Sequence, residues 1–285
     1  MSLQKTLNQK EGLIIPYEIL LNVMDELTLE AEESQQQKVW WIKYDSEFPE
    51  KLLLIDDYNG PPQGSPQRAR FRAIRLVSQI NRQMRSMVHQ KFRRFPLQER
   101  HTPSSVKAWV VSRIDAFIPY CSQSSVELTP EEHWFLQNLT LPTPKGHAIV
   151  ACLERLYLPS TYYLTITNAD AVRMVSTLPN LKQVSMNVGM FNHDILMTPG
   201  KRHCGIIPID ENIFPELSSW AILSPSFFHM WGPFQKRGIK LYGTLINPAE
   251  PMMELIITKE YIRIKFLEPD CPCCELAKTG KGNAM

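Results

Sequence analysis

Three cysteines close to the C-terminus, Cys271, Cys273 and Cys274, contain a Cys-x-x-Cys spacing that could bind a metal ion or form a redox pair. A zinc site needs about four ligands, and the other candidates show no second spacing of this kind: Cys121, Cys152, Cys204, His193 and His203. A thioredoxin-type pair requires a dithiol at a helix start after a strand, but Pro272 stands inside the motif. We expect no metal and no cofactor, and we interpret residues 271–285 as a polar tail. Zinc binding is the alternative.

Catalytic motifs of the common enzyme classes are absent from the sequence. It contains no Gly-x-Gly-x-x-Gly, no Gly-Lys-Ser/Thr phosphate loop, no Gly-x-Ser-x-Gly and no His-Glu-x-x-His. His193 precedes Asp194 and Glu132 precedes His133, but adjacent side chains do not face each other on a helix or strand. We predict that the protein is not an enzyme. An enzyme of a class without a recognisable motif is the alternative.

Charge is distributed unevenly along the first third of the chain. Residues 1–57 hold five Lys and twelve acidic residues, whereas residues 58–98 hold eight Arg, one Lys and no acid. A basic helix over 68–94 would be suited to nucleic acid. However, its arginines alternate with a full apolar stripe, which favours a packed helix with a solvated face. Nucleic-acid association through residues 68–94 is therefore the alternative function rather than the main one.

Apolar periodicity predicts three helices in the N-terminal part. The first covers 12–27, with Pro16 in its first turn and a stripe that includes Ile19 and Val23. The second covers 68–95 and ends at Pro96. A third is predicted over 102–118, from the spacing of Val106, Val110, Ile114 and Phe117. Between the first two helices, the runs Val39–Ile42 and Leu52–Ile55 are too apolar for a simple linker.

The C-terminal half changes to a strand-rich pattern. Leu153–Leu158 and Leu181–Met186 share the spacing apolar-x-x-apolar-x-apolar and lie 28 residues apart, with a predicted helix over 169–178 between them. Leu217–Ile222 resembles a third copy. One strand and one helix per unit is the arrangement of a leucine-rich repeat. The alternative is an ordinary α+β domain with two similar βα units. Further strands are predicted over 239–267.

An aromatic segment precedes these last strands. Trp220, Phe227, Phe228, Met230, Trp231 and Phe234 lie close together, and Gly232 and Pro233 predict a turn between the last two aromatic residues. Such a segment is either core or a partner surface, because aromatic residues dominate binding hot spots. We predict that Trp231 and Phe234 are exposed and anchor a protein target.

Two strings in the N-terminal region resemble a known interaction motif. Ile14-Ile15-Pro16-Tyr17-Glu18-Ile19-Leu20 is similar to the opening of an F-box, and Ile74-Arg75-Leu76-Val77-Ser78 is similar to its later helix. The chain thus resembles the F-box proteins of fungi, with an insertion at about 28–67. The resemblance implies a substrate-recognition adaptor that binds the Skp subunit of a cullin–RING ubiquitin ligase. The residues expected to contact Skp are Ile15, Pro16, Ile19, Leu20, Val23, Leu76 and Val77. Packing of this stripe on the chain's own core is the alternative.

Composition is typical of a folded, globular protein. Apolar residues make up 44% of the 285-residue chain and charged residues 21%, as in globular proteins. No apolar run reaches the roughly 18 residues that a membrane span needs, and the N-terminus lacks a signal-peptide pattern. We predict a cytoplasmic or nuclear protein with an α+β fold. An F-box-like helical module over 1–100 is followed by an α/β region over 101–270 that has leucine-rich-repeat character and binds an unknown protein substrate.

Overall fold

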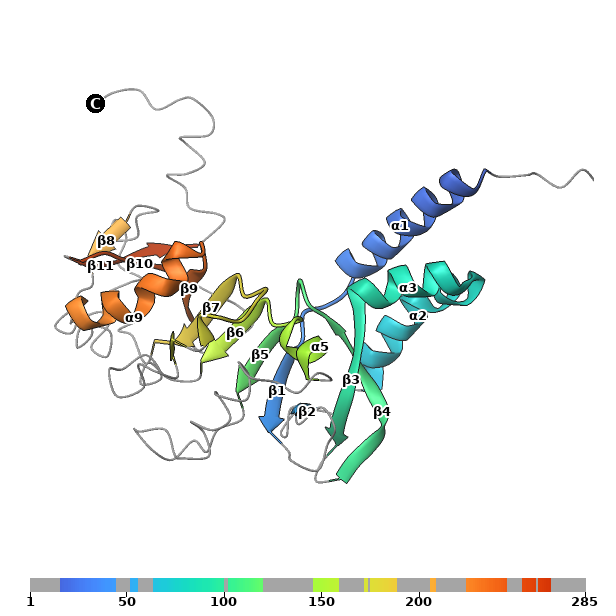
Figure 1. Cartoon of the computed structure of the whole chain (residues 1–285), viewed down its shortest axis with the longest axis horizontal. Helices are drawn as coiled ribbons and strands as arrows, with labels where there is room; N and C mark the ends of the chain where they lie inside the picture. Colours follow the sequence, from blue (N-terminus) through green and yellow to red (C-terminus); the bar gives the residue numbers. More distant parts are fainter. Residues whose placement is uncertain are drawn as a thin grey trace, which may run out of the picture.

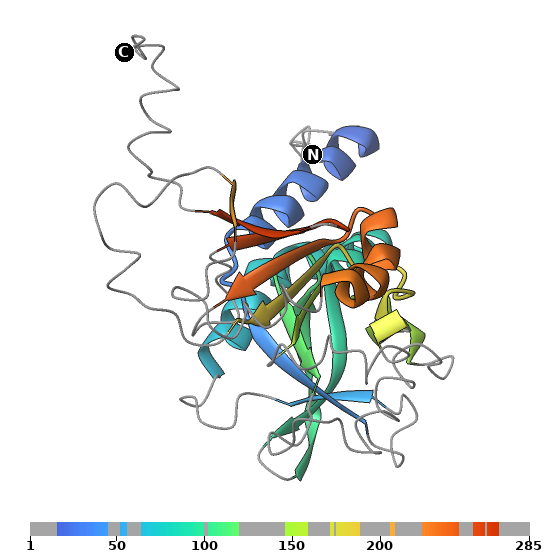
Figure 2. The ribbon, with the colours of Figure 1, turned by 90° about the vertical axis from the view of Figure 1, so that its left-hand side faces the viewer.

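The computed structural model describes residues 16–44, 52–55, 64–99, 102–119, 146–158, 172–173, 175–188, 206–208, 224–244, 253–259 and 261–267. Within these ranges the chain has an α+β fold, built on one mixed sheet with helices at both ends (Figure 1). A second view, turned by 90°, shows the C-terminal strands in front and α1 behind them (Figure 2). The predicted α+β class is therefore confirmed.

The described helices are interspersed among runs of two or three strands along the chain. The helices are α1 Tyr17–Glu33, α2 Gly64–Ile80, α3 Arg82–Lys91, α5 His147–Val150 and α9 Ser224–Lys236. The strands are β1 Val39–Tyr44, β2 Leu52–Ile55, β3 Phe92–Glu99, β4 Thr102–Val111, β5 Ala116–Pro119, β6 Arg155–Leu158, β7 Gln183–Asn187, β8 Ile206–Pro208, β9 Lys240–Thr244, β10 Met253–Ile257 and β11 Ile262–Phe266. They form an eleven-stranded sheet in the order β4-β3-β2-β1-β5-β6-β7-β9-β10-β11-β8.

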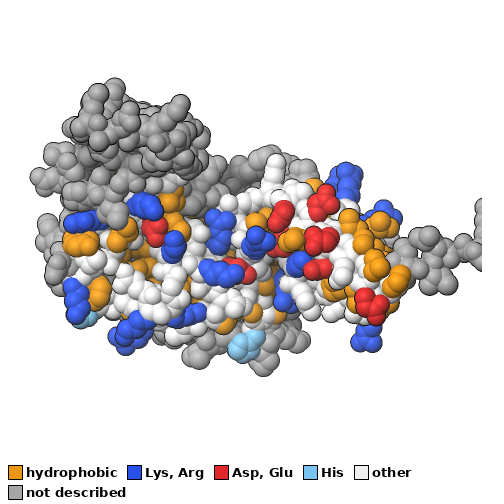
Figure 3. Space-filling model, turned by 90° about the horizontal axis from the view of Figure 1, so that it is seen from above, with side chains coloured by type: hydrophobic (Ala, Val, Ile, Leu, Met, Phe, Trp, Pro, Cys, Tyr) orange, Lys and Arg blue, Asp and Glu red, His pale blue; other side chains and the backbone are white. Residues whose placement is uncertain are grey.

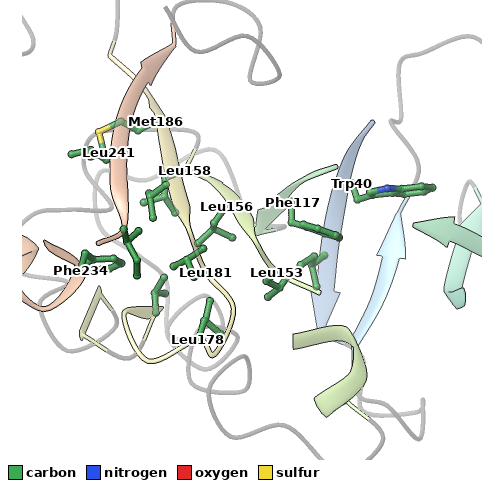
Figure 4. Close-up of a cluster of buried hydrophobic side chains, with 14 of the residues drawn as sticks. Trp40, Phe117, Leu153, Leu156, Leu158, Leu178, Leu181, Met186, Phe234 and Leu241 are labelled. Carbon is green, nitrogen blue, oxygen red and sulfur yellow. The ribbon is translucent and has the colours of Figure 1, made fainter. Parts of the chain in front are cut away.

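Five successive strands in the middle of this sheet run parallel, in the order β1, β5, β6, β7 and β9. One residue from each of these strands pairs with one residue of the next strand, which forms a row across the sheet. All five residues of this row are buried: Trp40, Phe117, Leu156, Val184 and Leu241. Parallel strands are usually covered on both faces, and β5 is buried throughout. Figure 4 shows part of the resulting hydrophobic cluster, from Trp40 across the strands to Leu241.

The predicted pair of similar strands corresponds to β6 and β7. They are parallel neighbours, and each residue of β6 pairs with the residue 28 positions later, from Arg155 with Gln183 to Leu158 with Met186. The structure also describes helical residues inside the predicted 169–178 helix, at Val172, Arg173 and Val175. The predicted third copy at 217–222 lies outside the described residues. In the sheet, β9 occupies the position next to β7.

Residues 102–118 do not form the predicted helix. They form strands β4 and β5, joined by a turn, and β4 pairs with β3 in an antiparallel hairpin. The four-residue apolar spacing suited a helix, but Val106, Val110 and Val111 are β-branched and fit a pleated surface better. This hairpin spans residue 100, so the sheet does not stop at the predicted module boundary. The apolar runs at 39–42 and 52–55 join the same sheet as β1 and β2.

The strands predicted over 239–267 are confirmed as β9, β10 and β11, which form an antiparallel series. The turn predicted at Gly232 and Pro233 is wrong, because both residues lie inside α9. The chain leaves this helix through Gly238, whose φ of 71° suits glycine.

Candidate partner-binding surface

Helices α1, α2 and α3 pack together at one end of the molecule around a small core of their own (Figure 1). Its buried members come from all three helices and the adjoining strands: Ala31, Ile74, Val77, Met84, Val88, Phe92 and Val111. The first and third helices run in the same direction, because Tyr17 hydrogen-bonds Gln83 and Lys91 pairs with Asp25 at 3.0 Å. The predicted first and second helices therefore meet in space although about 40 residues separate them.

The predicted helix 68–95 is divided in two at Asn81. The backbone of Asn81 is extended, and its side chain caps α3 by accepting a hydrogen bond from the Met84 amide at 2.9 Å. Asparagine is a favoured N-cap residue, so the break has a local cause that apolar periodicity does not reveal. The helix then ends at Lys91, and Phe92 begins β3. A continuous basic helix, on which the nucleic-acid alternative relied, is thus not formed.

One face of α1 carries an exposed apolar stripe. Ile19, Val23 and Leu27 recur every four residues and are 52%, 46% and 39% exposed, and Pro16 precedes them on the same side. The neighbouring face packs inward through Leu20, Leu21 and Met24. Because an amphipathic helix usually buries its apolar side, this stripe is apolar surface beyond what the fold itself uses.

A second stripe lies on α2. Leu76 is 72% exposed and Ile80 42% exposed, while Ile74 and Val77 face the helical core. We call the two stripes together the apolar helical surface; it consists of Pro16, Ile19, Val23, Leu27, Leu76 and Ile80. Figure 3 shows hydrophobic side chains gathered at this end of the molecule, beside acidic ones. Of the eight large hydrophobic residues that are exposed in the described structure, five belong to this surface.

The six described residues among those predicted to contact Skp divide into three groups. Pro16, Ile19, Val23 and Leu76 are exposed. Leu20 is half-buried against the helical core. Val77 is 4% exposed and belongs to that core, so its prediction as a contact residue is wrong. Ile15 lies outside the described residues. Sequence analysis gave no contact role to Leu27 and Ile80, which continue the same stripes by one turn each and could have been found by extending the four-residue spacing.

The predicted target anchors Trp231 and Phe234 are buried, at 2% and 1% exposed. Their rings stack on each other with centroids 4.3 Å apart, and both belong to the main hydrophobic cluster. The prediction that they anchor a protein target is therefore wrong. The helix α9 places them three residues apart on the face that packs against the sheet, so these two aromatic residues belong to the core.

A buried ion pair joins the helical end to the sheet. Arg70 of α2 and Asp115, just before β5, are 1% and 0% exposed, and their closest atoms lie 2.6 Å apart. Asp115 also accepts hydrogen bonds from the Lys38 and Val111 amides and from the Trp40 indole. Arg70 further donates to the carbonyls of Gln36 and Trp109. Because the two charges satisfy each other and the surrounding backbone, this pair fixes α2, and with it the apolar helical surface, against β1, β4 and β5.

Sequence analysis did not single out Arg70 or Asp115. Arg70 is one of eight arginines within 58–98, and only the tertiary structure separates it from its exposed neighbours. The position of Arg70 in the helical repeat could have indicated that it is buried. It lies four residues before Ile74 and seven before Val77, on the buried stripe of the helix.

The described part of the chain offers few side chains suited to metal binding or nucleophilic chemistry. No group of three His, Cys, Asp or Glu side chains there could hold a metal ion. Burial raises the pKa of the Cys152 thiol, which disfavours the reactive thiolate. Burial also raises the pKa of Glu32 on α1, against the attraction of Arg113 and Lys91. The motif at Cys271–Cys274 lies outside the described residues. Among the described helices, none has both the length and the apolar character that crossing a bilayer requires.

No protein-family model, curated protein or solved structure matches this chain. The resemblance to F-box proteins therefore has no support from these comparisons and rests on the residues of α1 and α2 alone.

Proposed function

We propose that this protein is the substrate-recognition adaptor of a Skp–cullin–F-box ubiquitin ligase and that its apolar helical surface binds the Skp subunit. The observation that carries the proposal is the exposure of Ile19, Val23 and Leu76 on two packed helices. Grouped exposed apolar side chains, such as the stripe of Ile19, Val23 and Leu27 on α1, mark interaction sites in folded proteins. The proposed role is binding, without chemistry on the target.

The two strings that resemble an F-box belong to the helices that carry the stripes. Pro16 to Leu20 opens α1, and Ile74 to Ser78 lies in α2. Each buried Ile or Leu contributes roughly 1.5–3 kcal/mol, so several such side chains on one surface are enough for a stable contact after the cost of association. An apolar groove on the partner is the matching chemistry.

The insertion between the two strings is compatible with this proposal. It extends α1 to Glu33 and adds β1 and β2 to the sheet, while α1 still packs on α2 and α3 through the helical core. A compact three-helix arrangement therefore forms despite the long connection, and the buried pair of Arg70 and Asp115 holds it against the sheet.

The proposed target-binding region is the α/β part of the chain, although not the Trp231–Phe234 segment. Support for leucine-rich-repeat character comes from the parallel neighbours β6 and β7, with their 28-residue register, and from β9 beside them. Repeat strands of this kind build rigid, extended surfaces.

Co-purification with recombinant Skp tests the proposal. The double variant Ile19→Asp, Val23→Asp places two charges at the proposed apolar contact and should reduce the recovered Skp to background. Both residues are about half exposed, so the variant should keep the urea unfolding midpoint of the original protein. These positions are preferable to Leu20, which packs on the helical core.

Tyr261→Asp is the control. Tyr261 is also an exposed hydrophobic residue, but it lies beside β11, near the end of the sheet that is farthest in strand order from β3 and β4. This variant should leave Skp recovery unchanged. If the original protein does not retain Skp, or if a folded Ile19→Asp, Val23→Asp variant retains it fully, the adaptor proposal is wrong.

A further inference from the structure

A basic pocket lies at the junction of α3, the β3–β4 hairpin and α5. Its volume is about 420 Å³, and its walls are formed by His89, Arg93, Arg94, Phe95, Lys107 and Ala148. It is separate from the apolar helical surface, none of whose residues lines it. Small-molecule sites typically have volumes of roughly 300–1,000 Å³, so the pocket has room for an anionic group together with part of the molecule that carries it.

The polar side chains that line this pocket are all basic. Arg93, Arg94 and Lys107 are all exposed to solvent, and within the described ranges none of them forms a salt bridge with a carboxylate. Burial lowers the pKa of His89, and the positive charges of Arg94, Arg85 and Arg93 lower it further. The imidazole thus lies in a positive potential. Gathering like charges around one pocket is unfavourable unless an anion compensates it.

The basic side chains are held in place from one side by Trp109. The His89 ring stacks on the indole with centroids 5.5 Å apart, and the Arg94 guanidinium lies 5.0 Å from the same ring. The Trp109 backbone is fixed in turn, because Gln67 bonds both its amide and its carbonyl and Arg70 bonds the carbonyl. Two of the pocket's four basic groups therefore rest on a rigid support, which lowers the cost of ordering them around a ligand.

We propose that this pocket binds a phosphate monoester, with Arg94 and Lys107, which share one face of the β3–β4 hairpin, as the main ligands of the phosphate and Arg93 and His89 as supporting donors. Guanidinium groups match phosphate oxygens in charge and geometry. Phe95 and Ala148 give the pocket an apolar wall, which suits the organic part of an ester better than a free ion. The proposal does not rest on the adaptor function and can be tested without Skp.

Calorimetric titration of the full chain with phenyl phosphate tests this inference. The variant Arg93→Gln, Arg94→Gln should bind phenyl phosphate at least about tenfold more weakly, because the loss of one charge-assisted hydrogen bond raises the Kd by roughly a factor of ten. The matched control is Arg72→Gln, Arg75→Gln, which removes the same charge from exposed positions of α2 outside the pocket and should change the affinity by less than about twofold. Arg93→Lys, Arg94→Lys keeps the charge but loses the fork and should fall between them.

Two further titrations separate the ester from its parts. Inorganic phosphate should bind more weakly than phenyl phosphate, and phenol should not bind. Absence of phenyl phosphate binding would overturn the proposal, as would equal weakening by the pocket variant and its control. A single-stranded oligonucleotide that binds more tightly than phenyl phosphate and is weakened equally by both double variants would indicate an extended phosphate-backbone surface instead. If Arg93→Gln, Arg94→Gln does not fold, the variant Arg93→Lys, Arg94→Lys tests the proposal instead. Unchanged affinity of this variant for phenyl phosphate would contradict the role of the guanidinium groups.

Discussion

The helices α1–α3 and the parallel strands β6, β7 and β9 both present apolar side chains at regular spacing, but they differ in what covers those side chains. In the strands, Leu156, Val184 and Leu241 lie in one row and are buried. In the helices, Ile19 and Leu76 have equally apolar side chains and are 52% and 72% exposed. Regular spacing therefore indicates that residues share a face, whereas neighbouring elements decide whether that face is covered.

The difference also separates stability from binding. Residues of the strand row contribute to the free energy of unfolding, because their burial is complete within the chain. Residues of the apolar helical surface contribute little to folding and are available to a partner. The buried pair of Arg70 and Asp115 joins α2 to the sheet beside β1, β4 and β5. The following predictions test the division between stability and binding from the largest expected effect to the smallest.

Asp115→Ala should be the most destabilising change. It leaves the Arg70 charge buried and removes the acceptor of the Lys38 and Val111 amides and of the Trp40 indole. Breaking a buried pair in this way costs about 3–5 kcal/mol, which urea unfolding followed by circular dichroism would measure. Replacing both partners, Arg70→Met with Asp115→Ala, should recover part of this loss. A loss below about 1 kcal/mol in the single variant would show that the pair does not hold the regions together.

Leu156→Ala and Leu76→Ala form a matched pair of identical chemistry. Leu156 is 1% exposed, and its truncation should cost about 2–5 kcal/mol. Leu76 is 72% exposed, and its truncation should change the unfolding free energy by no more than about 0.5 kcal/mol. The same urea experiment measures both. Similar costs at the two positions would contradict the contrast between the strand row and the apolar helical surface.

Gly243→Ala tests the packing at the end of the strand row. An added Cβ at this position would lie 2.7 Å from Met253 Cγ and 2.9 Å from Val188 Cγ1. Crowding of this kind costs about 1–3 kcal/mol, and the flexible Met253 can relieve part of it. The expected result is a urea midpoint below that of the original protein. An unchanged midpoint in Gly243→Ala would show that β9 and β10 accommodate the methyl group.

The smallest effect concerns pH. The pKa of His89 is lowered in the folded protein, mainly by burial and also by Arg94, Arg85 and Arg93. The unfolded chain therefore takes up the proton first, and stability should fall as pH decreases from about 6.5 toward the lowered folded pKa. His89→Gln should flatten this part of the pH dependence of the urea midpoint. Because His89 is only partly buried, the two proteins should differ little in the pH dependence of their urea midpoints. Identical pH dependence would contradict a lowered pKa of His89 in the folded protein.

Sequence patterns were sufficient for several local elements. The apolar stripe and Pro16 predicted α1, although the helix runs on to Glu33. The 28-residue offset predicted two similar strands, and β6 and β7 pair in that register. These features depend on short-range spacing, which the sequence contains in full.

The prediction of a helix over 102–118 was wrong because it relied on short-range spacing alone. A four-residue apolar spacing fits a helix, but the same residues can alternate across a strand when a partner strand is present. Here β3 supplies that partner through a hairpin. Pairing between strands is a tertiary event, and one segment's spacing does not contain it.

The sequence by itself determined which residues share a face: Ile19 with Val23 on one helix, and the matching positions of β6 and β7 on neighbouring strands. Only the tertiary structure decided which faces are covered. It buried Trp231, Phe234 and Val77, left Leu76 exposed, and selected Arg70 from a run of arginines to pair with Asp115. The physical reason is that periodicity is a property of the local backbone, whereas burial depends on elements brought together from distant parts of the chain.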